Sequence, residues 1–239
     1  MDNDRDVFKR FKMNILTVIP ARCGSKGIKD KNIIDICKKP LIAYSIESAL
    51  QLKEKKMVKK VVVSTDCKKI ADIALKYGAE VPFLRPKELA TDKSKSIDFM
   101  IHMIKNLEDS FDAILLLQPT SPLRSMEILI EAIEKFKMTN TNSLISVYKE
   151  EYINDLVMYN INGKKLKPLN PLHNKGIRRQ EHNNIYVRNG SIYLSKVDYL
   201  LKTKQVICDN PAYVEMKKSE SINIDTIEDV KILKRSLGC

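Results

Sequence analysis

The sequence predicts an α/β fold: a Rossmann-like, mostly parallel sheet with helices on both faces. Three observations predict it. The 239 residues suffice for one sizeable core, short β-rich apolar runs alternate with helical stripes, and polar candidate site residues follow the ends of those runs. Apolar residues make up 44% of the chain and charged residues 30%, which is typical of a globular protein and excludes a disordered one.

The alternation starts after residues 1–13, which we interpret as a polar, charged tail before the fold. Residues 15–19 form an apolar run ended by Pro20, as expected for a buried parallel strand. Pro40 then opens a helical stretch with one apolar face, made of Ile42, Ile46, Ala49 and Leu50. Residues 60–65 are the second predicted strand.

The same pattern continues along the chain. Asp66 is a candidate N-cap for the next helix, which Gly78 ends. Three helical stripes follow in order: Ile70, Ile73, Ala74 and Tyr77; Ile97, Met100, Ile101 and Ile104; Ile128, Leu129, Ala132, Ile133 and Phe136. Residues 113–117 and 143–147 are predicted strands, so that helices are expected on both faces of the sheet.

The alternation breaks between about residues 150 and 186, a polar segment with Asn-Gly at 162–163 and no helical period. We expect short strands and turns there, outside the main sheet. A strand resumes at Gly190, and the last helix begins at Thr226, where Thr226 and Asp229 have the spacing of a capping box. The expected organisation is a tail over 1–13 and one domain over 14–239 that contains this excursion.

The net charge of +12 comes from 42 basic and 30 acidic residues that are spread along the whole chain. This spread favours solvated helix faces, and no aromatic–basic interleaving supports a nucleic-acid surface. No apolar run approaches the ~18 residues that span a bilayer, and no secretory pattern opens the chain. The five cysteines show no metal-binding spacing and predict reduced thiols in a cytoplasmic protein.

The first predicted strand is followed by a basic loop with glycines, at the strand end where open α/β sheets bind ligands. Backbone N–H groups and cations of such a loop suit phosphate oxygens, and its candidates are Arg22, Gly24, Ser25, Lys26 and Lys31. The loop fits neither the Walker A nor the Rossmann glycine pattern, which disfavours an NTPase and a dehydrogenase. Taken alone, a turn with solvated lysines explains it equally well.

Three more segments carry polar candidates. Residues 84–96 include Arg85, Ser94 and Ser96, although a helix capped by either serine explains this segment as well. Residues 117–124 hold two prolines, which stiffen a loop and suit recognition. Asp225 ends a predicted strand with Asn223 on the same face. Mg²⁺ takes one or two such oxygens besides substrate phosphates, and a helix-capping Asp is the alternative.

The chain resembles the acylneuraminate cytidylyltransferase family, the CMP-sialate synthetases and their relatives, over about residues 15–233. The resemblance rests on six segments in this order: IPARCGSKGIKDKN, STDCKKIADIALKYGA, LRPKELATDKSKS, LLQPTSPLR, RRQ followed by RNGSIYL, and INIDTIEDV. The 3-deoxy-octulosonate cytidylyltransferases are similar in the first loop, but they usually carry a proline where this chain has Asn32.

The resemblance implies a nucleotide-diphospho-sugar transferase fold, a homodimer joined through the excursion, and transfer of CMP from CTP to an acidic nine-carbon sugar with Mg²⁺ or Mn²⁺. Arg22, Lys26 and Asp225 are its catalytic candidates. It implies the following roles: Arg22, Lys26 and Lys31 for the triphosphate; Asn32, Arg85, Ser94 and Ser96 for cytosine and ribose; Gln118, Arg179, Gln180, Tyr186 and Arg188 for the sugar; Asp225 and Asn223 for the metal.

Two departures from the family pattern bear on the substrate. The family often has an Asp at the position of Asn223. Sialate members usually have a lysine where this chain has residues 155–157, and Arg-Pro where it has Val187 and Arg188. Because the latter positions lie near the sugar, we expect a sialic-like acid other than N-acetylneuraminate, such as legionaminic acid.

Other readings remain open. The acid could be another ulosonic acid such as pseudaminic or 3-deoxy-octulosonic acid. A nucleotidyltransferase for another nucleotide or a neutral sugar phosphate would share the fold and the basic loop. A non-catalytic polyanion-binding homologue would account for the positive charge and for Asn223.

Overall fold

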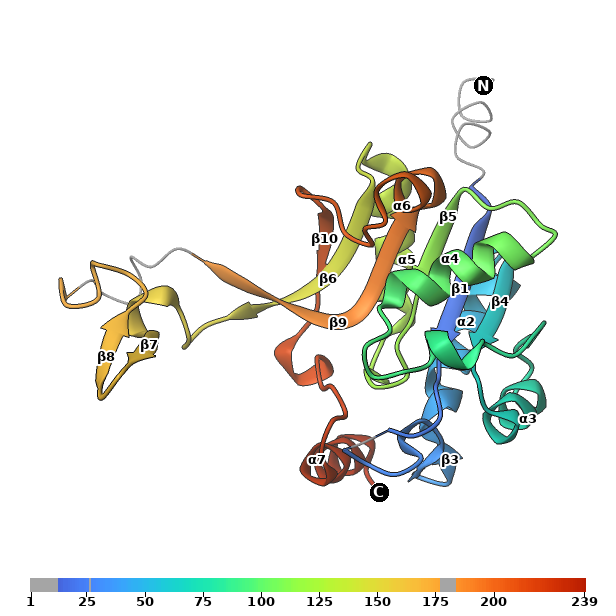
Figure 1. The fold of residues 1–239 in the computed structure, drawn as a ribbon, viewed down its shortest axis with the longest axis horizontal. Coiled ribbons are helices and arrows are strands. Elements are labelled where there is room, and N and C mark those ends of the chain that lie inside the picture. Colours follow the sequence, from blue (N-terminus) through green and yellow to red (C-terminus); the bar gives the residue numbers. More distant parts are fainter. Residues whose placement is uncertain (1–12, 26, 177–183) are drawn as a thin grey trace.

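The computed structural model describes residues 13–25, 27–176 and 184–239. Its centre is a six-stranded sheet with the strand order β10-β6-β9-β5-β1-β4 (Figure 1). The strands of this sheet are β1 (Ile15–Pro20), β4 (Lys60–Ser64), β5 (Ala113–Leu116), β6 (Ser143–Glu150), β9 (Ile185–Lys196) and β10 (Ala212–Glu215). Two small antiparallel pairs lie outside it: β2 (Asp35–Ile36) with β3 (Lys39–Pro40), and β7 (Tyr159–Asn162) with β8 (Lys165–Pro168).

The predicted mostly parallel sheet is confirmed, with one antiparallel strand in its middle. β1 pairs in parallel with β4 and β5, and β10 pairs in parallel with β6. β9 runs antiparallel to both β5 and β6. A parallel return after β6 would require a crossover connection, whereas the excursion sends the chain back directly alongside the strand that it left.

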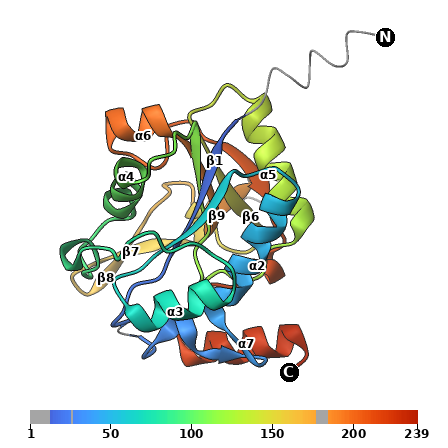
Figure 2. The same ribbon diagram turned by 90° about the vertical axis from the view of Figure 1, so that its right-hand side faces the viewer.

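Helices cover both faces of the sheet, as expected (Figure 2). One face carries α2 (Leu41–Glu54), α3 (Lys68–Lys76) and α5 (Met126–Met138), and the other carries α4 (Ser96–Asn106) and α6 (Val197–Thr203). Strand side chains alternate between the two layers: Ile15 and Ile19 of β1 pack with the first, Leu16 and Val18 with the second. Short 3-10 turns occur at Lys31–Ile33, Lys87–Leu89, Asp155–Val157 and Lys218–Glu220.

Most local predictions agree with these elements. The five predicted residues of the α5 stripe are all buried. The last helix, α7 (Ile227–Leu237), begins after Thr226, whose N–H donates to Asp229 Oδ2 at 2.7 Å while Thr226 Oγ1 accepts from the Asp229 N–H at 3.3 Å. The predicted capping box is therefore confirmed. The predicted Asp66 cap is wrong, because Cys67 occupies the cap position of α3 without a side-chain bond.

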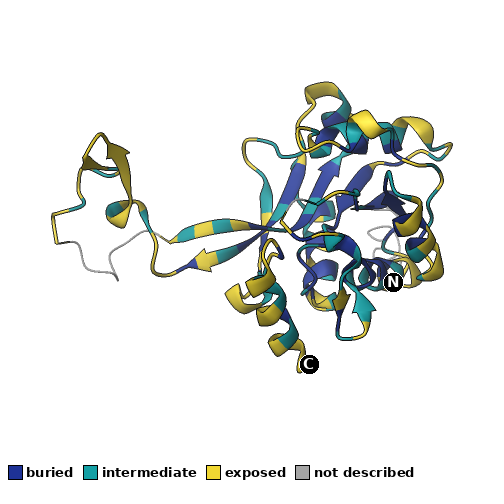
Figure 3. Cartoon of the chain, turned by 60° about the horizontal axis from the view of Figure 1, so that its bottom comes forward, coloured by how far each residue is buried: buried dark blue, intermediate teal, exposed yellow. Residues whose placement is uncertain are grey.

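The excursion forms an arm that projects from the body of the molecule (Figures 1 and 3). We call its described residues 151–176 the arm. The β7–β8 pair turns at Gly163, whose φ of 62° lies in the left-handed region. β7 is exposed along its whole length and β8 is exposed apart from its last residue, which confirms the expected short strands and turns outside the main sheet.

The cysteines differ from the prediction. Cys37 and Cys239 form a disulfide with their Cα atoms 5.8 Å apart, whereas Cys23, Cys67 and Cys208 are free. The prediction of five reduced thiols is therefore wrong for one pair. The two partners are 202 residues apart in the sequence and meet because α7 lies against β2, which no cysteine spacing reveals.

Across the described ranges, the structure contains no helix with the length and apolarity required to cross a membrane.

Candidate active site

A cavity of about 400 Å³ lies beyond the carboxyl ends of β1 and β5. From β1 the chain first goes to β4 on one side and later returns to β5 on the other, so these ends flank a topological switch point. The cavity is lined by many of the predicted site residues: Arg22, Ser25, Lys31, Asn32, Arg85, Ser94, Ser96 and Gln118. Three segments that are far apart in the sequence thus contribute to one site.

Two hydrogen bonds with side chains hold the backbone of the first loop, which follows β1. The buried side chain of Asn32 donates from Nδ2 to the Arg22 carbonyl at 3.1 Å. Asp66 Oδ1 accepts from the Cys23 N–H at 2.8 Å, which is the role that replaces its predicted helix cap. The backbone at Arg22 and Cys23 is therefore held in place, while Arg22 lines the cavity.

Gly27 explains how closely this loop approaches the strand end at Asp225. A Cβ atom at Gly27 would lie 2.8 Å from the Asp225 carbonyl oxygen, nearer than a real Cβ can come. Only glycine permits this contact. Gly27 therefore allows the first loop, the candidate for phosphate binding, to lie against Asp225, the candidate metal ligand.

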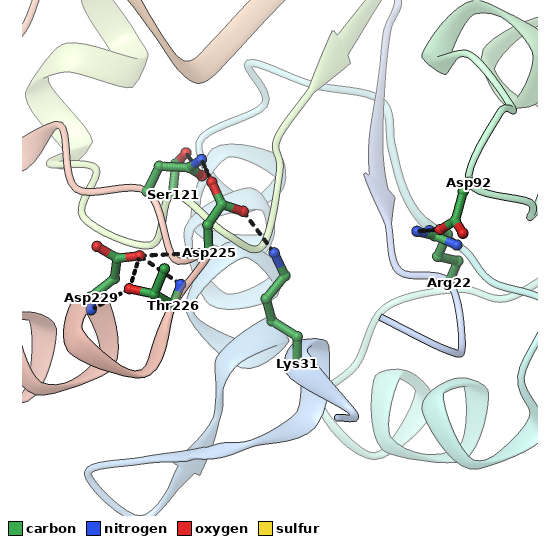
Figure 4. A network of polar contacts seen from close by, with 8 residues as sticks. Arg22, Lys31, Asp92, Ser121, Asp225, Thr226 and Asp229 are labelled. Carbon is green, nitrogen blue, oxygen red and sulfur yellow. Dashed lines mark hydrogen bonds and ion pairs between the residues drawn. The ribbon is translucent and has the colours of Figure 1, made fainter. Parts of the chain in front are cut away.

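Two cations of the site, Arg22 and Lys31, form ion pairs with carboxylates (Figure 4). Arg22 contacts Asp92 at 2.5 Å, and Lys31 Nζ contacts Asp225 Oδ1 at 2.9 Å. The Asp225 side chain is 64% exposed and the Arg22 side chain 31%. Both pairs are accessible, so an incoming anion or cation can exchange with them.

Arg85 is the buried cation of the site. Its Nε donates to Ser64 Oγ at 3.0 Å, and its guanidinium lies 4.5 Å from the centre of the Phe99 ring. Burial lowers the pKa of Arg85 to about 10, which leaves it charged at neutral pH. Arg85 therefore holds a fixed positive charge at the end of β4.

Ser94 and Ser96 do not cap the helix that follows them. Ser94 Oγ donates to the Glu88 carbonyl at 2.9 Å and accepts from the Thr91 N–H at 3.0 Å, so it closes its own loop. Lys95 precedes α4, and Ser96 is the first residue of the helix. The capping alternative is therefore wrong, and both serines line the cavity instead.

Asp225 and Asn223 form the candidate metal site. Asn223 Nδ2 donates to Asp225 Oδ2 at 2.7 Å, and Asp229 Oδ2 accepts from the Asp225 N–H at 3.0 Å. Among the residues that the structure describes, no three His, Cys, Asp or Glu side chains cluster as a metal cage. A hard cation that takes one or two protein oxygens and shares substrate phosphates still fits this donor set.

On the other side of Gln118 lies strand β9. A Cβ at Gly190 would lie 3.9 Å from both Gln118 Oε1 and Ser121 Oγ, and 3.8 Å from the Tyr193 hydroxyl. Gly190 has a φ of 75°, so β9 can bend toward Gln118 without strain. The polar groups of the two segments therefore meet at one place beside the cavity.

The other predicted sugar residues are placed differently. Arg188 lies over Tyr193, with the guanidinium carbon 6.0 Å from the ring centre, and the Tyr186 ring lies 5.9 Å from the Tyr213 ring, tilted by 42°, at the edge of the sheet. Neither Tyr186 nor Arg188 is among the residues that line the 400 Å³ cavity. Tyr186 and Arg188 therefore lie on β9 but do not line the cavity.

Three predicted residues, Lys26, Arg179 and Gln180, lie outside the described residues. Sequence reasoning missed Asp66 and Asp92, which contact the first loop. Asp92 stands inside a predicted segment, but no signal separates a carboxylate that pairs with a phosphate-binding arginine from one in solvent.

A family model described as "Cytidylyltransferase" matches residues 16–235. The CMP-N,N'-diacetyllegionaminic acid synthase of Legionella pneumophila is 39% identical over 222 residues, which are 90% of this chain and 92% of that protein. The N-acylneuraminate cytidylyltransferase of Escherichia coli is 33% identical over 228 residues, 92% of this chain but 51% of that protein, so this chain spans about half its length.

The fold also matches a solved structure, that of a CMP:2-keto-3-deoxy-manno-octonic acid synthetase in complex with CTP. The TM-score is 0.70 at 18% sequence identity, and the match covers 94% of this chain and 98% of that one. At this identity the likeness shows a shared fold, a mostly parallel sheet flanked by helices.

Proposed function

Because the chain belongs to the cytidylyltransferase family and is a nucleotidyltransferase, we propose that it transfers CMP from CTP to a sialic-acid-like nonulosonic acid. The acceptor is the C2 hydroxyl of the sugar, and pyrophosphate is the second product. The product would serve the synthesis of bacterial surface glycans.

One observation carries this proposal: Arg22, Lys31, Arg85 and Gln118 all line a single cavity. The cations of Arg22 and Lys31 suit a triphosphate, and the buried Asn32 and Arg85 suit a base and ribose held away from water. The amide of Gln118 faces the strand β9, where we place the sugar.

In the proposed reaction, the C2 oxygen bonds to the α-phosphorus of CTP as the bond from that phosphorus to the leaving oxygen breaks. Pyrophosphate departs with the electron pair, and the hydroxyl proton passes to solvent. Such transfers require positioning and neutralisation of charge more than covalent work by the protein. Arg22 and Lys31 would move from their carboxylate partners to the phosphate oxygens.

We propose Mg²⁺ or Mn²⁺ as the metal, held by Asp225 and Asn223 together with phosphate oxygens. When bound, the cation would neutralise charge that develops on the leaving pyrophosphate. Asp229 fixes the backbone of Asp225, and departure of Lys31 to the phosphates leaves one Asp225 oxygen free. The chain thus couples the arrival of the triphosphate to the availability of its metal ligand.

For the sugar, we propose legionaminic acid before N-acetylneuraminic acid. The altered residues 155–157 and 187–188 motivate this order, and the 39% identity to a legionaminic relative against 33% to a neuraminate relative supports it.

The proposed assembly is a homodimer through the arm. Several of its apolar side chains are exposed in the single chain: Ile153, Val157, Ile161, Leu166, Leu169 and Leu172. Exposed apolar side chains gathered on a projecting element mark a protein interface.

The experiment is pyrophosphate release from CTP and Mg²⁺ with legionaminic, N-acetylneuraminic, pseudaminic and 3-deoxy-octulosonic acids, with ATP, GTP and UTP as controls. We expect turnover with CTP alone among the nucleotides, and fastest with legionaminic acid. Equal turnover with the other nucleotides would contradict the assignment to CTP. Inactivity of folded protein across all the acids would contradict the reaction and favour a homologue that binds without turnover.

A further inference from the structure

Arg124 is a buried arginine that the proposed reaction does not use. It ends the loop after β5 that begins at Gln118, and 8% of its surface is exposed. Burial lowers the pKa of Arg124 to about 9, so the guanidinium remains charged at neutral pH. A buried charge requires compensating partners, and those of Arg124 therefore show what it does.

The guanidinium of Arg124 contacts three different elements. Nε donates to the Ser191 carbonyl of β9 at 2.9 Å, and one terminal nitrogen donates to Ser45 Oγ of α2 at 3.0 Å. The other terminal nitrogen donates to the Gln118 carbonyl. The fixed fork of an arginine thus joins the loop after β5, helix α2 and strand β9 at one point.

The acceptors are all neutral oxygens. Among the ion pairs that the structure gives for described residues, none involves Arg124. Its positive charge therefore lies behind Gln118, and no carboxylate of the described residues forms an ion pair with it. An anion bound in front of Gln118 would be attracted by this charge, because its field is weakly screened in a buried site.

Two of the three contacts end beside the place where Gln118 meets β9. Ser191 follows Gly190, whose Cβ position is 3.9 Å from Gln118 Oε1. Arg124 holds the carbonyl of Gln118 and the carbonyl of Ser191 at the same time, so it sets the distance between the two walls. Its hydrogen-bond partners among the described residues include neither Arg85 nor a residue of the first loop.

We propose that Arg124 is a positioning residue for the acidic acceptor: it fixes Gln118 against β9 and contributes the positive charge behind them. This inference rests on the proposed function. It requires Arg124 to affect binding and turnover of the sugar and to leave the affinity for CTP almost unchanged.

The principal variant is Arg124→Lys, which keeps the charge but has no planar fork to bridge three acceptors. We expect kcat/KM for the sugar to fall about 100-fold, the loss expected for a misplacement of about 1 Å at a reacting group. The KM for CTP should change less than about twofold. Arg235→Lys, at an exposed position in α7, is the matched control and should behave as the unaltered protein.

A second, milder variant keeps the test valid if Arg124→Lys fails to fold. Ser45→Ala removes one of the three acceptors and leaves the other two. We expect a fall of about threefold to tenfold in kcat/KM for the sugar, again with the KM for CTP unchanged. A parallel fall for both substrates in Arg124→Lys and Ser45→Ala would overturn the proposal and assign Arg124 a purely structural role.

Hydrogen exchange separates this inference from the proposed function. In Arg124→Lys, the amides of Gln118, Thr120, Ser121 and residues 189–193 should exchange faster while those of the first loop remain as before. If the unaltered protein turned over none of the acids, the proposed function would fail, whereas unchanged exchange in both segments would overturn the role of Arg124 independently.

Discussion

At the scale of single residues, the candidate site holds its cations on carboxylates that the proposed substrates would displace. Arg22 lies on Asp92 and Lys31 on Asp225, and these partners are 39% and 64% exposed. Pairs this exposed contribute about 0–1 kcal/mol, so their separation costs little. The site therefore keeps its charged groups ordered before the substrates arrive.

Arg22→Ala should lower kcat by about 100-fold or more, because it removes a charge that would stabilise the leaving pyrophosphate. The unfolding midpoint should fall by no more than about 2–4 °C, since an exposed pair is worth at most about 1 kcal/mol. Pyrophosphate release and thermal unfolding measure the two quantities. Lys231→Ala, which breaks the exposed pair with Glu228, is the control and should leave the rate unchanged. A variant at Arg22 with a near-normal rate would exclude the triphosphate role.

Asn223→Asp should lower the Mg²⁺ concentration for half-maximal rate by about tenfold, because a second carboxylate beside Asp225 strengthens attraction for a hard cation. A Mg²⁺ titration of pyrophosphate release measures this. Asn223→Ala is the companion variant and should raise the Mg²⁺ requirement. If Asn223→Asp raised it as well, Asn223 would not be a metal neighbour.

Arg22, a basic residue of the first loop, and Arg85 and Gln118, whose roles the family resemblance implies, are predicted site residues that line the cavity. The contact of Asp66 with the first loop was not predicted, because its local pattern resembles a helix cap and its partner, Cys23, is 43 residues away in the sequence. Arg124 was missed because two of its three acceptors, Ser45 Oγ and the Ser191 carbonyl, lie 79 and 67 residues away in the sequence.

At the scale of elements, the junction between β6 and the arm is held by a buried carboxylate. Glu150 is the last residue of β6 and accepts from Lys218 Nζ at 2.7 Å and from the Tyr152 N–H at 3.0 Å. These donors lower the pKa of Glu150 from 4.5 to about 2. Periodicity predicted β6 but ended it at residue 147, because polar residues after that point conceal the strand that leads to the arm.

Glu150→Gln should lower the unfolding midpoint at neutral pH and lose this effect in acid. The folded-state pKa is depressed, so the carboxylate stabilises the fold above pH 4.5 and the contribution disappears as the pH falls toward 2. Thermal unfolding of both proteins from pH 7 to pH 2 measures the difference. Glu228→Gln, at an exposed pair, should show a smaller difference throughout. A difference that did not shrink below pH 4.5 would exclude the ionised pair as its source.

At the scale of the whole molecule, the arm carries apolar surface that a single chain leaves in water. Ile161 is 83% exposed and Leu166 is 65% exposed, and these residues lie opposite each other on β7 and β8. The sequence predicts the arm as a break in the α/β alternation. Its direction away from the body depends on the antiparallel return of β9, which strand patterns do not reveal.

Ile161→Glu combined with Leu166→Glu should convert the proposed dimer to monomer, because two charges would be buried against apolar surface at the interface. Light scattering measures the mass, and circular dichroism checks that the body remains folded. Lys164→Glu, at the turn between the same strands, is the control and should leave the mass unchanged. A double variant that remains dimeric would place the interface elsewhere.

β9 runs without interruption from the base of the arm to the centre of the sheet. Side chains along a strand alternate between its two faces, so one residue inserted before Gly190 would turn every side chain between the insertion and the arm to the opposite face. A two-residue insertion would preserve them. The pairing with β6 already absorbs one irregularity, between Ile145 and Val147. Evolution of this segment is therefore expected to proceed by even steps in length, or by odd steps that add a bulge.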